Sequence, residues 1–133
     1  MNRERIEREL AILGEGGQLA EFIEGARPVV LYHSVPALGA PFGLADATDV
    51  IVPVPPGYAA GVIDLAGLPV GSPYLPHVRG GANSQGVISA AGREWQLASY
   101  HPHNGGGGPP WDPLVHGFHT YFDHLIAWLH RLS

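Results

Sequence analysis

The sequence lacks cysteine and lysine altogether, and it contains a single methionine. Without cysteine, the chain can form no disulfide, no thiolate metal site and no thioester. Without lysine, it cannot carry the Gly-Lys-Ser/Thr ending of a phosphate-binding loop. No apolar run approaches the roughly 18 residues that a membrane-spanning helix requires. These absences exclude thiol chemistry and P-loop nucleotide binding, and we expect no membrane association.

Positive charge is scarce and scattered along the chain. Seven arginines stand against twelve acidic residues, which gives a formal net charge of −5. No basic stripe is present to neutralise phosphates, so we expect no nucleic-acid partner. A hydrophobic content of 45% with 14% charged residues is typical of a folded chain, and 133 residues suit a single domain over residues 1–133. The charged residues 2–9 do not resemble a signal peptide, which favours a cytoplasmic location.

The first predicted element is an amphipathic helix over residues 2–13. Its apolar residues recur at spacings of four and three, which puts them on one face: Ile6, Leu10 and Leu13. Arg5 and Glu9 are four residues apart, so we expect them to pair on the opposite face. Glycines from residue 14 onward end the helix.

Strands are predicted where apolar or alternating runs lie between glycine and proline. These runs cover residues 19–24, 28–35, 50–54, a short stretch at 87–89, and 94–100. Residues 55–86 are rich in glycine and proline and are expected to be largely irregular.

The second predicted helix runs from Asp112 to the end of the chain. Asp112 is expected to cap it, with Pro113 at its first position. Its apolar residues fall within one arc of about 120°, namely Leu114, Phe118, Tyr121, Phe122, Leu125, Trp128, Leu129 and Leu132. That arc is expected to pack on the sheet, which leaves His116 and His119 facing solvent. The predicted fold class is therefore α+β, with the helices packed on an antiparallel sheet of about four strands.

One loop concentrates the residues that could carry chemistry. His101-Pro102-His103-Asn104 lies between the last predicted strand and the second helix, and four glycines and two prolines follow it. The two histidines and the asparagine are the candidate catalytic residues. A metal site on the two histidines would need a third ligand, for which Asp64 and Asp112 are the plausible donors. Neither has diagnostic spacing, so we expect no metal and no cofactor.

The order of these landmarks resembles the ubiquitin-conjugating-enzyme-like (UBC-like) superfamily, and more narrowly a bacterial branch found beside ubiquitin-like and activating-enzyme genes. The proline-rich residues 52–58 are similar to the family's tyrosine–proline segment after its third strand. Residues 92–96 open the last strand, and His101-Pro102-His103 stands where the family carries His-Pro-Asn. Trp111-Asp112-Pro113 is similar to the tryptophan-x-proline that opens the family's next helix. The resemblance covers most of the chain and is most specific over residues 92–131.

The resemblance implies a UBC-like fold and a ubiquitin-like protein, or an activating or conjugating enzyme, as partner. It also implies Tyr58 and Trp111 as binding residues. Conjugating enzymes carry their modifier on a cysteine about eight residues beyond His-Pro-Asn, and eight residues beyond His103 stands Trp111. The glycine and proline residues 105–110 replace the active-site segment. The usual thioester carrier is therefore excluded.

Three hypotheses remain open from the sequence. In the preferred one, this cysteine-less chain binds or positions a ubiquitin-like protein or a conjugation partner without chemistry of its own. In the second, it transfers the modifier through an oxyester, with His101 or His103 as general base. Ser99 is near in sequence, but its strand face holds Trp95 and Leu97, which predicts a core-facing hydroxyl. In the third, a domain of another fold binds a metal or small ligand at the histidine loop.

Overall fold

Two α-helices, a short 3-10 helix and six strands make up the part of the chain that the structure, a computed structural model, describes: residues 3–103 and 109–133. In chain order they are α1 (Arg3–Glu15), β1 (Ala20–Ile23), β2 (Val29–Pro36), the 3-10 helix (Ala40–Phe42), β3 (Ala47–Pro53), β4 (Ala66–Pro69), β5 (Ser84–Ala90), β6 (Arg93–Ala98) and α2 (Phe118–His130). The strands form one antiparallel sheet in the order β1-β2-β3-β4-β6-β5. The predicted α+β class is confirmed, but the estimate of about four strands was wrong.

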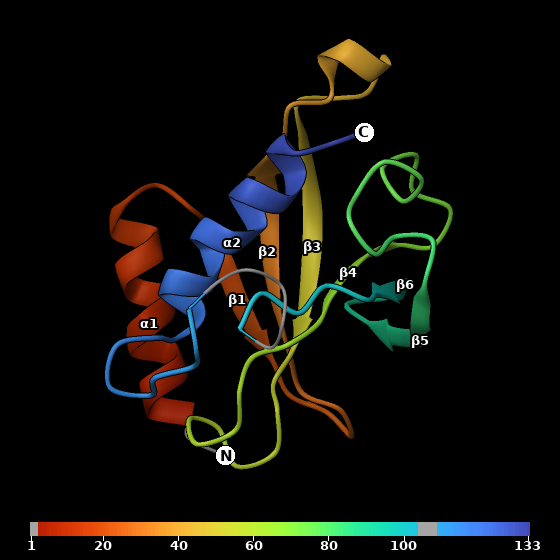
Figure 1. The fold of residues 1–133 in the computed structure, drawn as a ribbon. Helices are drawn as coiled ribbons and strands as arrows, with labels where there is room; N and C mark the ends of the chain where they lie inside the picture. Colours follow the sequence, from red (N-terminus) through yellow and green to blue (C-terminus); the bar gives the residue numbers. More distant parts are fainter. Residues whose placement is uncertain (1–2, 104–108) are drawn as a thin grey trace.

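Both helices lie on the same side of the sheet. In Figure 1, α2 crosses in front of β2 and α1 stands beside β1, while the β5–β6 hairpin projects away from the helices. The face under the helices carries the main core, to which β2 and β3 contribute Val30, Tyr32, Val50 and Val52. The alternate residues of the same strands, with Trp95 and Leu97 of β6, form a smaller cluster on the other face. The period-2 alternation of strand side chains therefore supplies two separate apolar layers.

The strand that the sequence did not predict is β4, inside the supposedly irregular residues 55–86. It is four residues long and contains Gly67 and Pro69, so its sequence carries little strand propensity. Tertiary packing explains why a glycine stands there. A Cβ atom on Gly67 would lie 2.7 Å from Ile51 Cγ2 and 3.0 Å from Leu97 Cδ2. The side chains of Ile51 in β3 and Leu97 in β6 therefore occupy the space that a side chain at position 67 would need, which favours glycine there.

The predicted start of the C-terminal helix was also wrong, since α2 begins at Phe118. Asp112 caps a separate short turn instead: its Oδ1 accepts the Leu114 N–H at 3.0 Å, and its carbonyl accepts the His116 N–H at 2.7 Å. Gly117 then interrupts the helical path with an extended backbone (φ −168°, ψ −168°). Leu114 is consequently 93% exposed and does not belong to the buried arc. The burial of five other members of the arc is confirmed, namely Phe118, Tyr121, Leu125, Trp128 and Leu129. Phe122 and Leu132 are half-buried against the core, and Leu132 lies beyond the end of α2.

In the described part of the chain, neither helix combines the length and the apolar character needed to cross a membrane.

Candidate functional site

The His101-Pro102-His103 turn follows directly after β6, and its two histidines enter different environments. His101 contacts Ser99 and Asp64. His103 is buried among the aromatic side chains at the start of α2. The two predicted catalytic histidines therefore do not act on one point. Asn104, the third predicted catalytic residue, lies outside the described residues.

Ser99, His101 and Asp64 form a chain of polar contacts. The Oγ of Ser99 lies 3.2 Å from the Nε2 of His101. On the other side of the ring, the Nδ1 of His101 lies 2.9 Å from the Oδ1 of Asp64. This nitrogen and this oxygen are both inaccessible to solvent, and neither makes a well-aligned hydrogen bond with any described residue. The side chains of His101 and Asp64 are nevertheless 31% and 30% exposed, which leaves the group open to a ligand.

The pairing of β4 with β6 explains why residues so far apart in sequence meet here. Ala66 is the partner of Ala98 in this antiparallel ladder. If this register is continued past the ends of both strands, Asp64 falls opposite residue 100, between Ser99 and His101. The expectation that the Ser99 hydroxyl points into the core was wrong: the residue is half-buried, and its Oγ contacts the imidazole of His101.

The backbone of Ser99 is held by the preceding loop. Its N–H lies 3.1 Å from the carbonyl oxygen of Gly80 and 3.2 Å from that of Asn83. Gly80 has a φ of +76°, and a Cβ at this position would collide with the backbone carbonyl of Ser99. A larger residue at position 80 would therefore push the loop off Ser99, so this glycine fixes the base of the site.

A groove of about 400 Å³ adjoins Asp64. Four prolines dominate its lining, namely Pro28, Pro53, Pro55 and Pro56. Asp64 and Arg27 are the two charged residues in the same wall. The proline-rich stretch that the sequence singled out thus forms a stiff, apolar surface next to the Ser99–His101–Asp64 group.

His103 is a packed imidazole. Its Nδ1 lies 2.8 Å from the carbonyl oxygen of Pro109, so this nitrogen carries the proton and donates it. Its ring centroid lies 4.7 Å from the rings of His116 and His124 and 5.2 Å from that of Trp111. Burial lowers the pKa of His103, and burial together with the neighbouring imidazole of His103 lowers the pKa of His124. The neutral form is therefore favoured for the rings of His103 and His124.

The expected solvent exposure of His116 and His119 was wrong, because both are half-buried. His116 precedes α2 and accepts the Asp112 N–H on its Nδ1 at 2.9 Å. His119 lies in the first turn of α2, and its buried Nδ1 has no hydrogen-bond partner among the described residues. Within residues 3–103 and 109–133, no three histidine or acidic side chains are grouped so that they could hold a metal ion. The metal hypothesis therefore gains no support there.

The two predicted binding residues, Tyr58 and Trp111, face one another at a ring distance of 6.1 Å. Tyr58 is 4% exposed, and its hydroxyl donates to Glu9 Oε1 at 2.7 Å. Burial, followed by this hydrogen bond, raises the pKa of Tyr58 well above its ordinary value. Trp111 is half-buried and donates from Nε1 to the carbonyl oxygen of Ala59 at 2.9 Å. A binding role for either residue remains a prediction.

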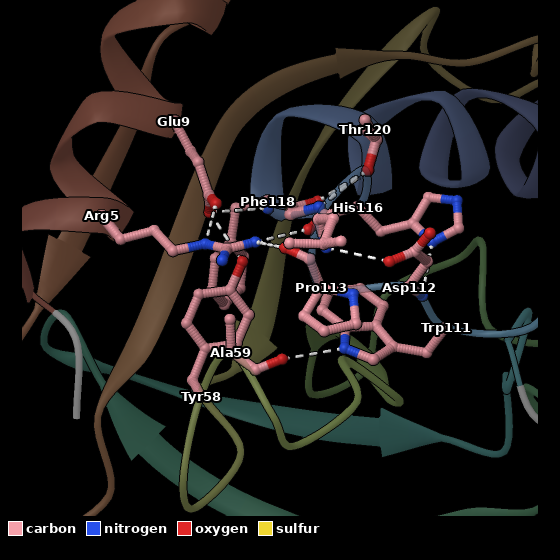
Figure 2. Close-up of polar contacts among 12 residues, drawn as sticks. Arg5, Glu9, Tyr58, Ala59, Trp111, Asp112, Pro113, His116, Phe118 and Thr120 are labelled. Carbon is pink, nitrogen blue, oxygen red and sulfur yellow. Dashed lines mark hydrogen bonds and ion pairs between the residues drawn. The ribbon is translucent and has the colours of Figure 1, made fainter.

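A carboxylate that was expected on a solvent-facing side of α1 is the centre of a second polar group. Arg5 and Glu9 pair as expected, at 2.8 Å, but Glu9 is only 5% exposed. Its Oε1 also accepts the Phe118 N–H at 3.0 Å, so α1 provides the cap of α2 (Figure 2). Arg5 reaches further, to the carbonyl oxygens of Pro113 and His116. The four-residue spacing indicated the ion pair but not its burial, since the partner helix is distant in sequence.

Comparison with known proteins adds no relative. No family model, no curated protein and no solved structure matches this chain.

Proposed function

We propose that this chain is a UBC-like domain without the carrier thiol, and that it serves a bacterial ubiquitin-like protein modification pathway. Its role there is to bind or position a ubiquitin-like protein or a conjugation partner. With no cysteine in the sequence, the chain cannot receive the modifier as a thioester. A positioning role needs only a surface of defined shape, which a rigid sheet with two packed helices provides.

The observation that carries this proposal is the convergence of three sequence landmarks in space. They are the tyrosine–proline segment, the His-Pro-His turn and the tryptophan before the closing helix. Trp111 joins them: its indole N–H donates to Ala59 beside Tyr58, and its ring lies 5.2 Å from that of His103. Segments separated by about 50 residues in sequence therefore form one cluster, which supports the view that their order is not accidental.

The element order gives further support. A helix precedes four strands that are adjacent both in sequence and in the sheet, β1 to β4. The closing helix α2 then packs on the same sheet (Figure 1). The β5–β6 hairpin contains the strands predicted at 87–89 and 94–100, and it stands between β4 and the His-Pro-His turn.

The test is a binding assay with the pathway proteins. The purified chain is mixed with the cognate ubiquitin-like protein, the activating enzyme and ATP, and complexes are detected by calorimetry and by size-exclusion chromatography with light scattering. We expect a complex with at least one of these proteins and no adduct that reducing agents cleave. Failure to bind the modifier, the activating enzyme and any conjugating enzyme would overturn the proposal.

A pair of variants links binding to the landmark cluster. Trp111→Ala removes the residue that joins the three segments, and we expect it to weaken the complex about tenfold or more. Phe42→Ala is the matched control, because Phe42 is a partly exposed aromatic residue in the 3-10 helix, outside the cluster. Equal affinity of both variants would show that the cluster does not shape the binding surface.

A further inference from the structure

We propose that Ser99, His101 and Asp64 form an acyl-transfer site in which the Ser99 hydroxyl is the nucleophile. The proposal rests on their contacts, 3.2 Å from Ser99 Oγ to His101 Nε2 and 2.9 Å from His101 Nδ1 to Asp64 Oδ1. It adds a chemical activity to the binding role proposed above and does not depend on that role. It requires only that the three side chains act together.

The order of the contacts matches the division of labour in a serine nucleophile site. A carboxylate next to Nδ1 keeps the imidazole proton on that nitrogen and stabilises the imidazolium that forms during reaction. The lone pair of Nε2 is then free to accept the proton of the serine hydroxyl. In this chain the carboxylate and the hydroxyl lie at opposite nitrogens of one ring, as this tautomer requires.

The bonding state of Asp64 and His101 favours chemistry over a purely structural role. Asp64 Oδ1 and His101 Nδ1 are shielded from solvent, yet neither has a well-aligned partner among the described residues. Unsatisfied buried polar atoms are costly, and they are found where a site needs them. The positive charge that develops on His101 when it takes the serine proton is the charge that the adjacent Asp64 carboxylate would stabilise.

The neighbouring groove indicates the class of acyl donor. Asp64 forms part of the groove of about 400 Å³, and apart from Arg27 the rest of the wall is apolar, with four prolines. Such a wall offers apolar contact and few hydrogen bonds to a substrate. We therefore assign the site to a carboxylic ester or thioester with an apolar acyl part, whose leaving group needs little help to depart.

The reaction proceeds in two balanced steps. Ser99 Oγ attacks the acyl carbon while its proton moves to His101 Nε2, and the bond to the alcohol or thiol leaving group breaks as that group takes up the proton. The product is an acyl ester on Ser99 and a free alcohol or thiol. Water then attacks this ester with His101 again as base, which releases the carboxylic acid and restores the hydroxyl. No metal, oxidant or reductant takes part.

The first test is covalent labelling of the full chain with a fluorophosphonate probe, together with release of nitrophenol from p-nitrophenyl acetate. We expect the label on Ser99 by peptide mass mapping and no label in Ser99→Ala. His101→Ala and Asp64→Asn are each expected to slow both reactions about 100-fold or more.

Matched controls separate the site from general surface reactivity. Ser89→Ala removes an exposed serine of β5, and His33→Ala removes a partly exposed histidine that pairs with Glu21. Both should label and turn over like the unaltered chain. No label on the unaltered chain, a label on another residue, or unchanged rates in His101→Ala would each overturn the proposal.

A second variant keeps the proposal testable if Ser99→Ala fails to fold. The chain has no cysteine, so Ser99→Cys introduces a unique thiol at the site. A cysteine next to an imidazole forms thiolate at lower pH than an isolated one. We expect iodoacetamide to alkylate Ser99→Cys at about pH 6 at least ten times faster than Ser89→Cys, and His101→Ala to remove that difference. Equal rates in the two single-cysteine variants would contradict a functional Ser99–His101 pair.

The binding assay and the labelling assay fail independently. A chain that labels at Ser99 but binds no pathway protein has the acyl-transfer site without the proposed pathway role. A chain that binds a pathway protein but does not label has the role without the site.

Discussion

Two carboxylates, Glu9 and Asp64, stand in polar groups of opposite character. Glu9 is nearly fully buried, and its oxygens accept hydrogen bonds from Arg5, Tyr58 and the backbone of Phe118. Asp64 is about one-third exposed, and its Oδ1 lies near one imidazole without an aligned hydrogen bond among the described residues. The buried Glu9 carboxylate, with its hydrogen bonds satisfied, holds two helices together. The partly exposed Asp64 carboxylate lacks an aligned hydrogen bond at Oδ1 and is available to balance a charge that appears during reaction.

The comparison also separates residues that the sequence grouped together. Tyr58 and Trp111 belong to the Glu9 group, where α1, the residues before α2 and the β3–β4 connection meet. His101 belongs to the Asp64 group. His103 lies between them as a neutral ring in an aromatic cluster. Proximity in sequence is therefore a poor guide to shared function within the His-Pro-His turn.

The largest expected effect on stability comes from removing the Glu9 carboxylate. Glu9→Ala leaves the Tyr58 hydroxyl and the Phe118 N–H buried without an acceptor, and it removes the carboxylate that pairs with Arg5. We expect the free energy of unfolding to fall by about 3 kcal/mol, measured by urea denaturation. Glu7→Ala is the control, since Glu7 is exposed and pairs only at the surface with Arg3. Its change should stay within about 0.5 kcal/mol; similar losses in both variants would refute a special role for Glu9.

A second variant compresses the same group without removing it. A Cβ on Gly117 would lie within 2.8 Å of three carboxylate atoms of Glu9, which its hydrogen bonds hold in place. Gly117→Ala is therefore expected to cost about 2 kcal/mol in thermal or urea unfolding. Gly14→Ala, in α1, meets no atom within 4 Å and should instead stabilise the chain by about 0.5 kcal/mol. A neutral Gly117→Ala would show that Glu9 can move aside.

The pH dependence of stability tests the histidine cluster that lies between the two groups. The pKa values of His103 and His124 are lowered by burial, so the unfolded chain binds more protons than the folded chain at mildly acidic pH. The stability that neutral rings provide is present above the unfolded value of about 6.5 and is lost as pH falls through the folded values. Urea denaturation at steps from about pH 7.5 to 5 should show this decline.

Two variants assign that decline to the cluster. His103→Phe keeps an aromatic ring and should flatten the pH dependence, while His130→Phe, on the exposed last turn of α2, should leave it unchanged. A slope that His103→Phe does not reduce would place the proton uptake elsewhere in the chain.

The smallest expected effect on stability comes from removing the Asp64 charge. Asp64→Asn removes a charge that is about one-third exposed and whose ion-pair partner among the described residues is His101. We therefore expect the free energy of unfolding to change by less than about 0.5 kcal/mol. The same variant should lower the acyl-transfer rate sharply. A large loss of stability would place Asp64 with Glu9 and end the contrast between the two carboxylates.

Local periodicity predicted most of the fold. Apolar residues at spacings of two, or of three to four, indicated the first helix, the first two strands and the buried face of α2. The structure confirms these elements at Arg3–Glu15, Ala20–Ile23, Val29–Pro36 and Phe118–His130. β4 was not predicted, because it contains a glycine and a proline, and the residues that pack around Gly67 are distant in sequence. The start of α2 was misplaced for the same reason, since its cap is Glu9 of another helix.

The candidate site was predicted only in part. The sequence selected His101 and considered both Ser99 and Asp64, but in separate hypotheses, as oxyester acceptor and as metal ligand. Only the pairing of β4 with β6 brings the three together. The signal that was available, alternation along β6, placed Ser99 in the core, because it took no account of where the strand ends at Ala98.

The β4–β6 ladder restricts which insertions and deletions the chain tolerates. One extra residue inside either short strand displaces the rest of that strand by about 3.3 Å and turns alternate side chains to the opposite face. Sequence variants that preserve Asp64, Ser99 and His101 should therefore keep the lengths of these two strands constant.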